Sequence, residues 1–217
     1  MNPMIKVARY HLVAQPVMFF GLPWTTVAGA FALALARPTS HGGLAFFFVM
    51  FFVTGVQRIG RWLPFGLALG ATRRSFYAGT ALLGVSMSLI SGLAIAGLQA
   101  IERGTGGWGR SVTFFRVTYL LNGPWYATWL TSFVVLSALF VYGMWYGIVN
   151  RRWGMLGLLA FIVVQVPAGI ALAFARAWSG IDGPHPSVSA LGLTGVIAAL
   201  TVVILASGHA TIRRATV

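Results

Sequence analysis

The sequence contains no cysteine, a single lysine and only two acidic residues, Glu102 and Asp182. The absence of cysteine excludes disulfide bonds, thiolate metal sites and a cysteine nucleophile. The four histidines lie apart at the ends of segments, so no group of residues is spaced for acid–base catalysis or for metal binding. The lysine, Lys6, does not follow a glycine-rich loop, which excludes a P-loop. We therefore expect no catalytic residue, no metal ligand and no cofactor in this chain.

Apolar residues are what the chain has in excess. Of its 217 residues 58% are hydrophobic and 8% are charged, and the mean hydropathy is +0.85. This composition is too apolar for a soluble domain and predicts an integral membrane protein. The net charge of +13 would suit nucleic acid in a soluble protein, but the basic residues stand at the ends of apolar runs. We expect membrane lipids, and no nucleic acid, as partners.

Six apolar runs come close to the length that a bilayer crossing requires. A segment before the first run, Met4–Gln15, alternates apolar and basic residues at helical spacing and predicts an amphipathic helix in the headgroup region. A cleaved signal peptide is the alternative for the first run, which is longer than the usual apolar core of such a peptide. The prediction is an all-α, polytopic membrane protein with one domain, 1–217, and six transmembrane helices. The expected spans are about 17–36, 44–57, 76–98, 125–149, 154–175 and 188–207.

Six spans place both termini on one side, and the distribution of basic residues selects that side. Ten basic residues fall on one side of the predicted topology and five on the other. Because basic residues are retained on the cytoplasmic side, we expect a multi-pass protein of the cell membrane with both termini in the cytoplasm. The ten are Lys6, Arg9, Arg58, Arg61, Arg73, Arg74, Arg151, Arg152, Arg213 and Arg214.

Two spans carry unusual side chains. The second span is dense in phenylalanine, which either faces lipid as apolar bulk or forms a wall for a greasy substrate. The fifth span holds Gln165 at bilayer depth, where an amide needs a partner on a neighbouring helix or in a substrate or gate. The phenylalanines in question are Phe47, Phe48, Phe51 and Phe52.

Small residues follow two patterns with different readings. In the third span they recur at every fourth position, which predicts close helix packing rather than a polar path. The run Gly104–Gly109 satisfies a dinucleotide-binding spacing, but no strand precedes it and no βαβ unit fits, so we reject that site. The small residues of the third span are Gly84, Ser88, Gly92 and Ala96.

The segment 58–75 interrupts the apolar sequence between the second and third spans and is expected to be a cytoplasmic loop. Within it Gly70 gives the backbone freedom to turn, Thr72 or Ser75 can cap a helix, and two adjacent cations, Arg73 and Arg74, precede aromatic residues. One interpretation is that the arginines only anchor the topology at the membrane surface. The other is that a short polar helix between two spans serves as a contact for a soluble partner.

The stretch from Leu69 to Thr80 resembles the loop between the second and third spans of type-2 ABC exporter permeases. The resemblance implies a coupling helix, which docks on a separate ABC-type ATPase subunit that binds ATP and Mg²⁺. It also implies a second permease subunit, identical or related, and a substrate pathway lined by the second and fifth spans, here with Phe47, Phe48, Phe51, Phe52 and Gln165. The coupling residues that the resemblance implies are Gly70, Ala71, Thr72, Arg73, Arg74, Phe76 and Tyr77.

Other functions remain open at this point. A non-catalytic assembly or sensor subunit needs the same apolar surface and no ATPase. A membrane-embedded lipid enzyme would need paired carboxylates or histidines near one surface, and the sequence has no such group. A proton-coupled carrier would need an ionisable residue within a span. The sequence identifies neither the substrate nor the direction of transport.

Overall fold

The computed structural model describes residues 21–36, 43–68, 70–115, 124–178 and 190–212, and all secondary structure within these ranges is helical. This confirms the predicted all-α class for the described part of the chain. The amphipathic helix predicted over Met4–Gln15 lies outside the described residues. The elements are α2 (Leu22–Ala36), α3 (Gly43–Ala68), α4 (Arg73–Gly104), the π-helical turn η2 (Gly107–Ser111), α5 (Trp125–Trp178) and α6 (Ala190–Ile212).

Four of the described helices contain segments that are long and apolar enough to cross a membrane, and the chain is therefore a helical membrane protein. The helix α2 is apolar but shorter. One of the four, within α5, spans 39 residues, which is more than one crossing of a bilayer core requires. The four segments are Phe46–Ala68, Arg73–Gly104, Trp125–Val163 and Leu191–Thr211.

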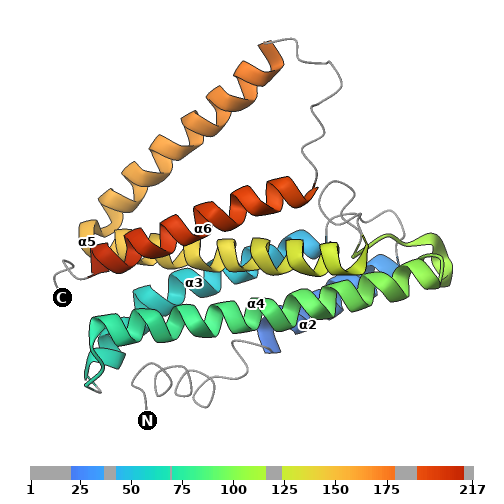
Figure 1. Ribbon diagram of the computed structural model, residues 1–217, viewed down its shortest axis with the longest axis horizontal. Helices are drawn as coiled ribbons and strands as arrows, with labels where there is room; N and C mark the ends of the chain where they lie inside the picture. The colour runs from blue at the N-terminus through green and yellow to red at the C-terminus, as the bar shows by residue number, and fades with distance from the viewer. Residues whose placement is uncertain (1–20, 37–42, 69, 116–123, 179–189, 213–217) are drawn as a thin grey trace.

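The helix α5 contains both the fourth and the fifth predicted spans. Its helical geometry breaks at Gly154, where φ is 65° and ψ is −165°. A residue with a side chain rarely adopts this conformation, so glycine allows the chain to turn back on itself here. In Figure 1 the second half of α5 (orange) diverges from the bundle as it leaves this turn, while the first half (yellow) lies within it.

The first half of α5 crosses α3 with the two backbones in contact. A Cβ atom on Gly143 would stand 2.2 Å from the carbonyl oxygen of Phe52, and one on Gly55 would stand 2.2 Å from that of Phe140. Gly147, four residues after Gly143, also lies against α3, where a Cβ would stand 2.9 Å from the carbonyl oxygen of Val56. Such a small-xxx-small pair lets two membrane helices approach closely. Sequence analysis missed this crossing, although the Gly143-x-x-x-Gly147 spacing was there to find it.

The small residues of α4 form a second close contact, this time with α5. A Cβ on Gly92 would stand 2.9 Å from the backbone nitrogen of Phe133, and one on Gly84 would overlap the ring of Phe140. Ser88 and Ala96 on the same stripe are buried. The predicted role of this stripe in helix packing is confirmed.

The helix α3 extends through Ala68, eleven residues beyond the predicted end of the second span. Gln57 and Arg58 indicated a membrane boundary, but Arg58 is buried, and Ile59 and Leu63 on the following turn belong to the core. Apolar residues four apart keep one face of the helix packed on its neighbours, so the helix continues. The loop predicted over 58–75 is therefore short in the structure.

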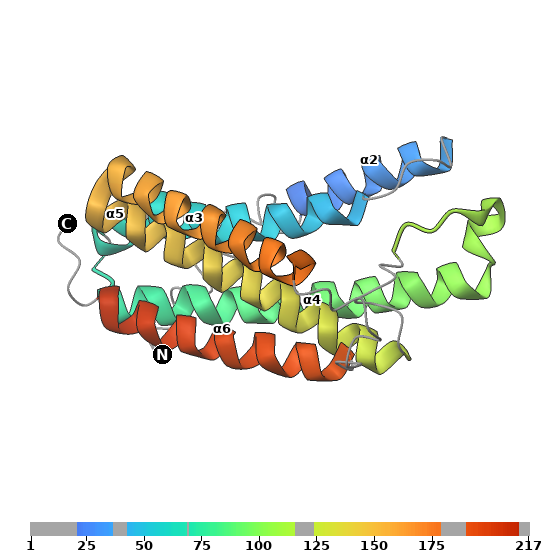
Figure 2. The ribbon, with the colours of Figure 1, turned by 90° about the horizontal axis from the view of Figure 1, so that it is seen from above.

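The two ends of the bundle differ in the elements that meet there. At one end lie the last turn of α3, the first turn of α4, the turn of α5 and the end of α6, as both ribbon views show (Figures 1 and 2). At the other end α4 leads into η2. The described residues that were predicted to face the cytoplasm, such as Arg61, Arg74 and Arg151, belong to the elements that meet at the first of these ends, and Glu102 belongs to the second.

Candidate functional site

The connection between α3 and α4 is built from two helix-terminal motifs in succession. Gly70, with φ 82°, donates its N–H to Leu67 O at 2.9 Å, and Ala71 donates to Gly66 O at 3.0 Å. These are the paired hydrogen bonds of a Schellman motif, which satisfies the last carbonyl groups of α3. Thr72 then caps α4, because its Oγ1 accepts the N–H of Ser75 at 3.2 Å. The connection is short and is closed by these three hydrogen bonds, and Thr72, one of the two predicted caps, occupies the capping position.

Two of the predicted coupling residues are buried inside the chain. Phe76 is 1% exposed, and its ring lies so close to Gly66 that a Cβ there would overlap it. Tyr77 is 2% exposed, and its hydroxyl donates to Leu205 O at 3.0 Å. Phe76 therefore fixes the start of α4 to α3, and Tyr77 fixes it to α6.

The remaining predicted coupling residues lie at the surface. Arg74, Thr72 and Gly70 are exposed, whereas Arg73 and Ala71 are half-buried. Because the ring of Phe76 is already covered by this chain, the exposed side chains available to a partner are those of Arg74 and Thr72. Phe76, which the resemblance implies as a coupling residue, is therefore not available for direct contact with a partner.

A second group of predicted residues meets inside the hairpin of α5. Gln165 accepts hydrogen bonds at its Oε1 from the hydroxyls of Tyr142 and Tyr146, the latter at 2.9 Å. The ring of Phe52 lies 5.2 Å from that of Tyr146 and 6.0 Å from that of Tyr142. Phe161 packs on the other side of Tyr146, at 5.1 Å. We call Phe52, Tyr142, Tyr146, Phe161 and Gln165 the tyrosine–amide cluster.

This cluster answers part of the sequence-based question about Gln165. The amide has the partners on a neighbouring helix that a polar group at bilayer depth requires. All of the cluster residues are half-buried, so the cluster is not sealed inside the core. A half-buried amide with two phenol groups can bind a neutral polar group by hydrogen bonds, while the flanking rings contact apolar carbon. The structure brings Gln165 together with only one of the predicted phenylalanines, Phe52.

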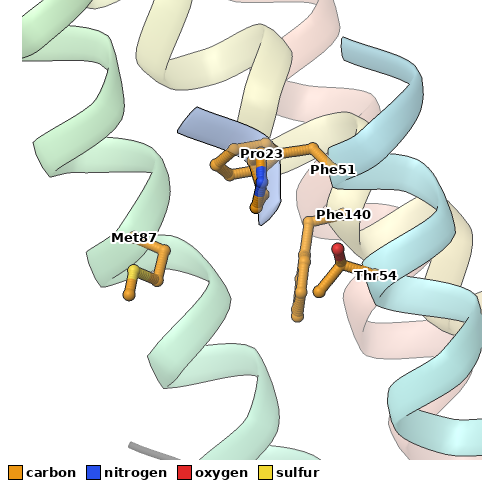
Figure 3. Close-up of a pocket in the computed structure, with 5 residues that line it drawn as sticks. All are labelled: Pro23, Phe51, Thr54, Met87 and Phe140. Atoms are coloured by element: carbon orange, nitrogen blue, oxygen red, sulfur yellow. The ribbon is translucent and has the colours of Figure 1, made fainter. Parts of the chain in front are cut away.

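The other predicted phenylalanines lie apart from this cluster. Phe47 and Phe51 belong to the core, where the ring of Phe47 contacts those of Trp24 and Phe51 at 5.2 and 5.1 Å. Phe48 is half-buried against the same core. Phe51 also lines a cavity of about 10 Å³, roughly the room of one water molecule, so no organic substrate fits there (Figure 3). Its other lining residues are Pro23, Thr54, Met87 and Phe140.

The opposite end of the bundle contains a polar site that sequence analysis did not predict. Glu102 is 3% exposed, and its Oε2 accepts three N–H groups. The donors are the backbone nitrogens of Phe114 and Phe115, at 3.1 and 2.9 Å, and the indole of Trp108, at 3.2 Å. Within the described part of the chain, the buried Oε1 has no hydrogen-bond partner. We call this arrangement the Glu102 clamp.

The clamp explains the glycine run that satisfied a dinucleotide spacing. Gly106, Gly107 and Gly109 have φ values between 62° and 85°, and Trp108 between them has φ 60°. Glycine adopts this left-handed conformation without strain, so the run reverses the chain and returns 114–115 to Glu102. Phe31 of α2 covers this reversed segment, with its ring centre 4.9 Å from that of Trp108 and 5.4 Å from that of Phe114. A lone acid beside glycines and aromatics was the signal in the sequence.

Among the described residues, no three histidine, cysteine or acidic side chains lie together. One oxygen of Glu102 is already engaged by three donors, far from any histidine that the structure describes. Comparison of the chain with protein-family models, with curated proteins and with solved structures finds no match. The function must therefore be argued from the geometry above.

Proposed function

We propose that this chain is the membrane-spanning subunit of an ATP-driven exporter and is coupled to a separate ATPase through the connection between α3 and α4. In this proposal two permease subunits form the substrate pathway, and two ATPase subunits bind and hydrolyse ATP with Mg²⁺. Both termini and the Arg74 end of the bundle face the cytoplasm of a cell membrane. The sequence resemblance to type-2 ABC exporter permeases motivates the proposal, and the geometry of the connection supports it.

One observation carries the proposal, namely how firmly the connection is tied to the bundle. The Schellman motif and the Thr72 cap leave little freedom between the helices. Phe76 packs on α3, and Tyr77 is hydrogen-bonded to α6. A force that a partner applies at the exposed Arg74 is therefore transmitted to α3, α4 and α6 together. A surface anchor that only sets topology does not need such fixation.

The tyrosine–amide cluster is the candidate substrate contact in this proposal. The cavity beside Phe51 is too small for a substrate, and this proposal places the pathway between two subunits. The half-buried rings and the amide of Gln165 suit an amphiphilic molecule with apolar carbon and a neutral polar group. A lipid, a drug and a modified peptide all meet this description.

Purification of the intact complex tests the proposal. A tagged chain extracted from its native membrane in mild detergent should carry a subunit with P-loop and Mg²⁺-binding motifs. Because Arg74 is exposed and Arg residues concentrate interface energy, Arg74→Glu should lower the recovery of that subunit at least about tenfold. Arg103→Glu, at the opposite end of α4, is the matched control and should keep wild-type recovery. Phe76→Ala is unsuitable, since it would leave a cavity in the core.

Three results would count against the proposal. Recovery of the wild-type chain with other membrane proteins but no ATPase would favour a non-catalytic assembly or sensor subunit. Equal loss of the ATPase in Arg74→Glu and Arg103→Glu would show that the effect is not specific to the connection. Recovery of the isolated chain with lipid-modifying activity would instead support a membrane-embedded enzyme.

A further inference from the structure

Three arginines gather where α3 and the turn of α5 meet. Arg61 lies on α3, and Arg151 and Arg152 immediately precede the turn at Gly154. All three side chains are exposed. Arg151 reaches across to α3, where its Nε and Nη2 donate to the carbonyl oxygen of Gly60 at 3.1 and 2.9 Å. The Arg151 guanidinium is thereby held at Gly60, the residue that precedes Arg61 in the sequence.

The contact between Arg151 and Gly60 has a cause in the sequence. In an α-helix the carbonyl of residue 60 accepts the N–H of residue 64, but Pro64 has no N–H to donate. Arg151 supplies the missing donors from the neighbouring helix. The position of Arg151 is thus fixed by the backbone of α3, and it is not an arbitrary rotamer of a surface arginine.

A tryptophan holds the second arginine of the turn. The guanidinium carbon of Arg152 lies 4.8 Å from the ring centre of Trp153, a cation–π contact. Trp153 is 50% exposed. Tryptophan is enriched at the level of lipid headgroups, and arginine beside it presents its charge to the same layer. The arginines therefore lie where headgroup phosphates are found.

The charge of this group is not balanced by a carboxylate of the described chain. Glu102 is the one carboxylate among the described side chains, and it lies near the last turn of α4, whose first turn is at the arginine end. At 1.5 Å per residue, the 32 residues of α4 separate the two ends by roughly 45 Å. Positive charges on adjacent residues such as Arg151 and Arg152 repel, and a bound anion relieves the repulsion.

We propose that Arg61, Arg151 and Arg152 form a binding site for the headgroup of an anionic phospholipid. The phosphate contacts the guanidinium groups, and the acyl chains lie along the exposed apolar face of α5 that starts at Leu156, which is 81% exposed. Basic groups between membrane helices on one side of a bilayer bind such headgroups. This site does not depend on the proposed transport function.

Local fluorescence quenching tests the site in the full-length protein, because the chain has no cysteine of its own. Leu156→Cys places a bimane label beside the arginines, and Ile101→Cys, at a position 50% exposed, places one at the opposite end of α4. The labelled proteins are reconstituted in phosphatidylcholine vesicles. Brominated phosphatidylglycerol and brominated phosphatidylcholine then compete for each site, and the ratio of quenching gives the relative association constant. We expect at least about five-fold selectivity for phosphatidylglycerol at position 156 at low salt, and a ratio near one at position 101.

Charge variants separate headgroup binding from a general effect of the fold. Arg61→Gln with Arg152→Gln should lower the selectivity at position 156 to a ratio near one, while Arg61→Lys with Arg152→Lys should keep most of it. Arg151 is left intact because it also supports α3. Equal selectivity at positions 156 and 101, or unchanged selectivity in the glutamine variant, would overturn the proposal. Loss of selectivity on adding inorganic phosphate at constant ionic strength would assign the site to free phosphate and would also overturn it.

Discussion

Glu102 and Gln165 are both polar acceptors that serve several donors within an apolar protein, but their surroundings differ. The Glu102 carboxylate is 3% exposed and accepts two backbone amides and an indole. The Gln165 amide is half-buried and accepts two tyrosine hydroxyls. Each of those hydroxyls can still accept a hydrogen bond, and the amide nitrogen can still donate. The first site is closed by its own chain, whereas the second keeps hydrogen-bonding capacity for a ligand.

This difference assigns separate roles to the two sites. The Glu102 clamp joins parts of the chain twelve and thirteen residues apart and lies under Phe31 of α2, so it stabilises one end of the bundle. The tyrosine–amide cluster joins the two arms of the α5 hairpin and remains half-buried. Mutations at the two sites should therefore separate stability from transport.

The largest effect on stability is expected for Glu102→Ala. The change leaves three donors without an acceptor, and each buried donor left unsatisfied costs about 1–3 kcal/mol, so unfolding should become easier by roughly 3 kcal/mol or more. Denaturation in mixed micelles measures the free energy of unfolding. Glu102→Gln is the matched control, since it keeps an acceptor oxygen and should lose less. If Glu102→Ala were as stable as the wild type, the clamp would have no structural role.

A smaller effect on stability, with a larger one on transport, is expected for Gln165→Leu. Hydrogen bonds between membrane helices contribute about 0.6–2 kcal/mol each, so the fold should survive the loss of two of them. Transport by the reconstituted complex, or its basal ATPase rate, should change because the polar contact is lost. Tyr142→Phe serves as a control that removes one donor and keeps the amide. Unchanged transport in Gln165→Leu would leave this cluster with a packing role only.

The helices were predictable from the sequence wherever one apolar run formed one helix, as in α4 and α6. The end of α3 was not, because Gln57 and Arg58 indicate a membrane boundary when read alone, and only the tertiary core keeps Arg58, Ile59 and Leu63 within the helix. The predicted gap between the fourth and fifth spans covered 150–153, and the structure turns at the next residue, Gly154. Helices and turns that local sequence determines could thus be predicted, whereas the burial of individual side chains could not.

In the candidate sites, too, features set by local sequence could be predicted, and features set by tertiary contacts could not. Thr72 could be predicted as a cap because the capping bond is local. The sequence indicated that Gln165 needs a hydrogen-bonding partner on a neighbouring helix, but it did not indicate which residues. Tyr142 and Tyr146 precede Gln165 by 23 and 19 residues and contact it only because the chain turns at Gly154. The Glu102 clamp depends on four successive residues near a left-handed conformation, which no periodic pattern indicates.

The central claim is that the connection between α3 and α4 contacts an ATPase, and crosslinking from Arg74 tests it most directly. Arg74→Cys is labelled with a photoactivatable maleimide, with Ile101→Cys as the control at the opposite end of α4. The account predicts that illumination of the purified complex gives an adduct between position 74 and the nucleotide-binding subunit, and none from position 101. A labelled and intact complex that gives no adduct from position 74, or equal adducts from both positions, would contradict the account.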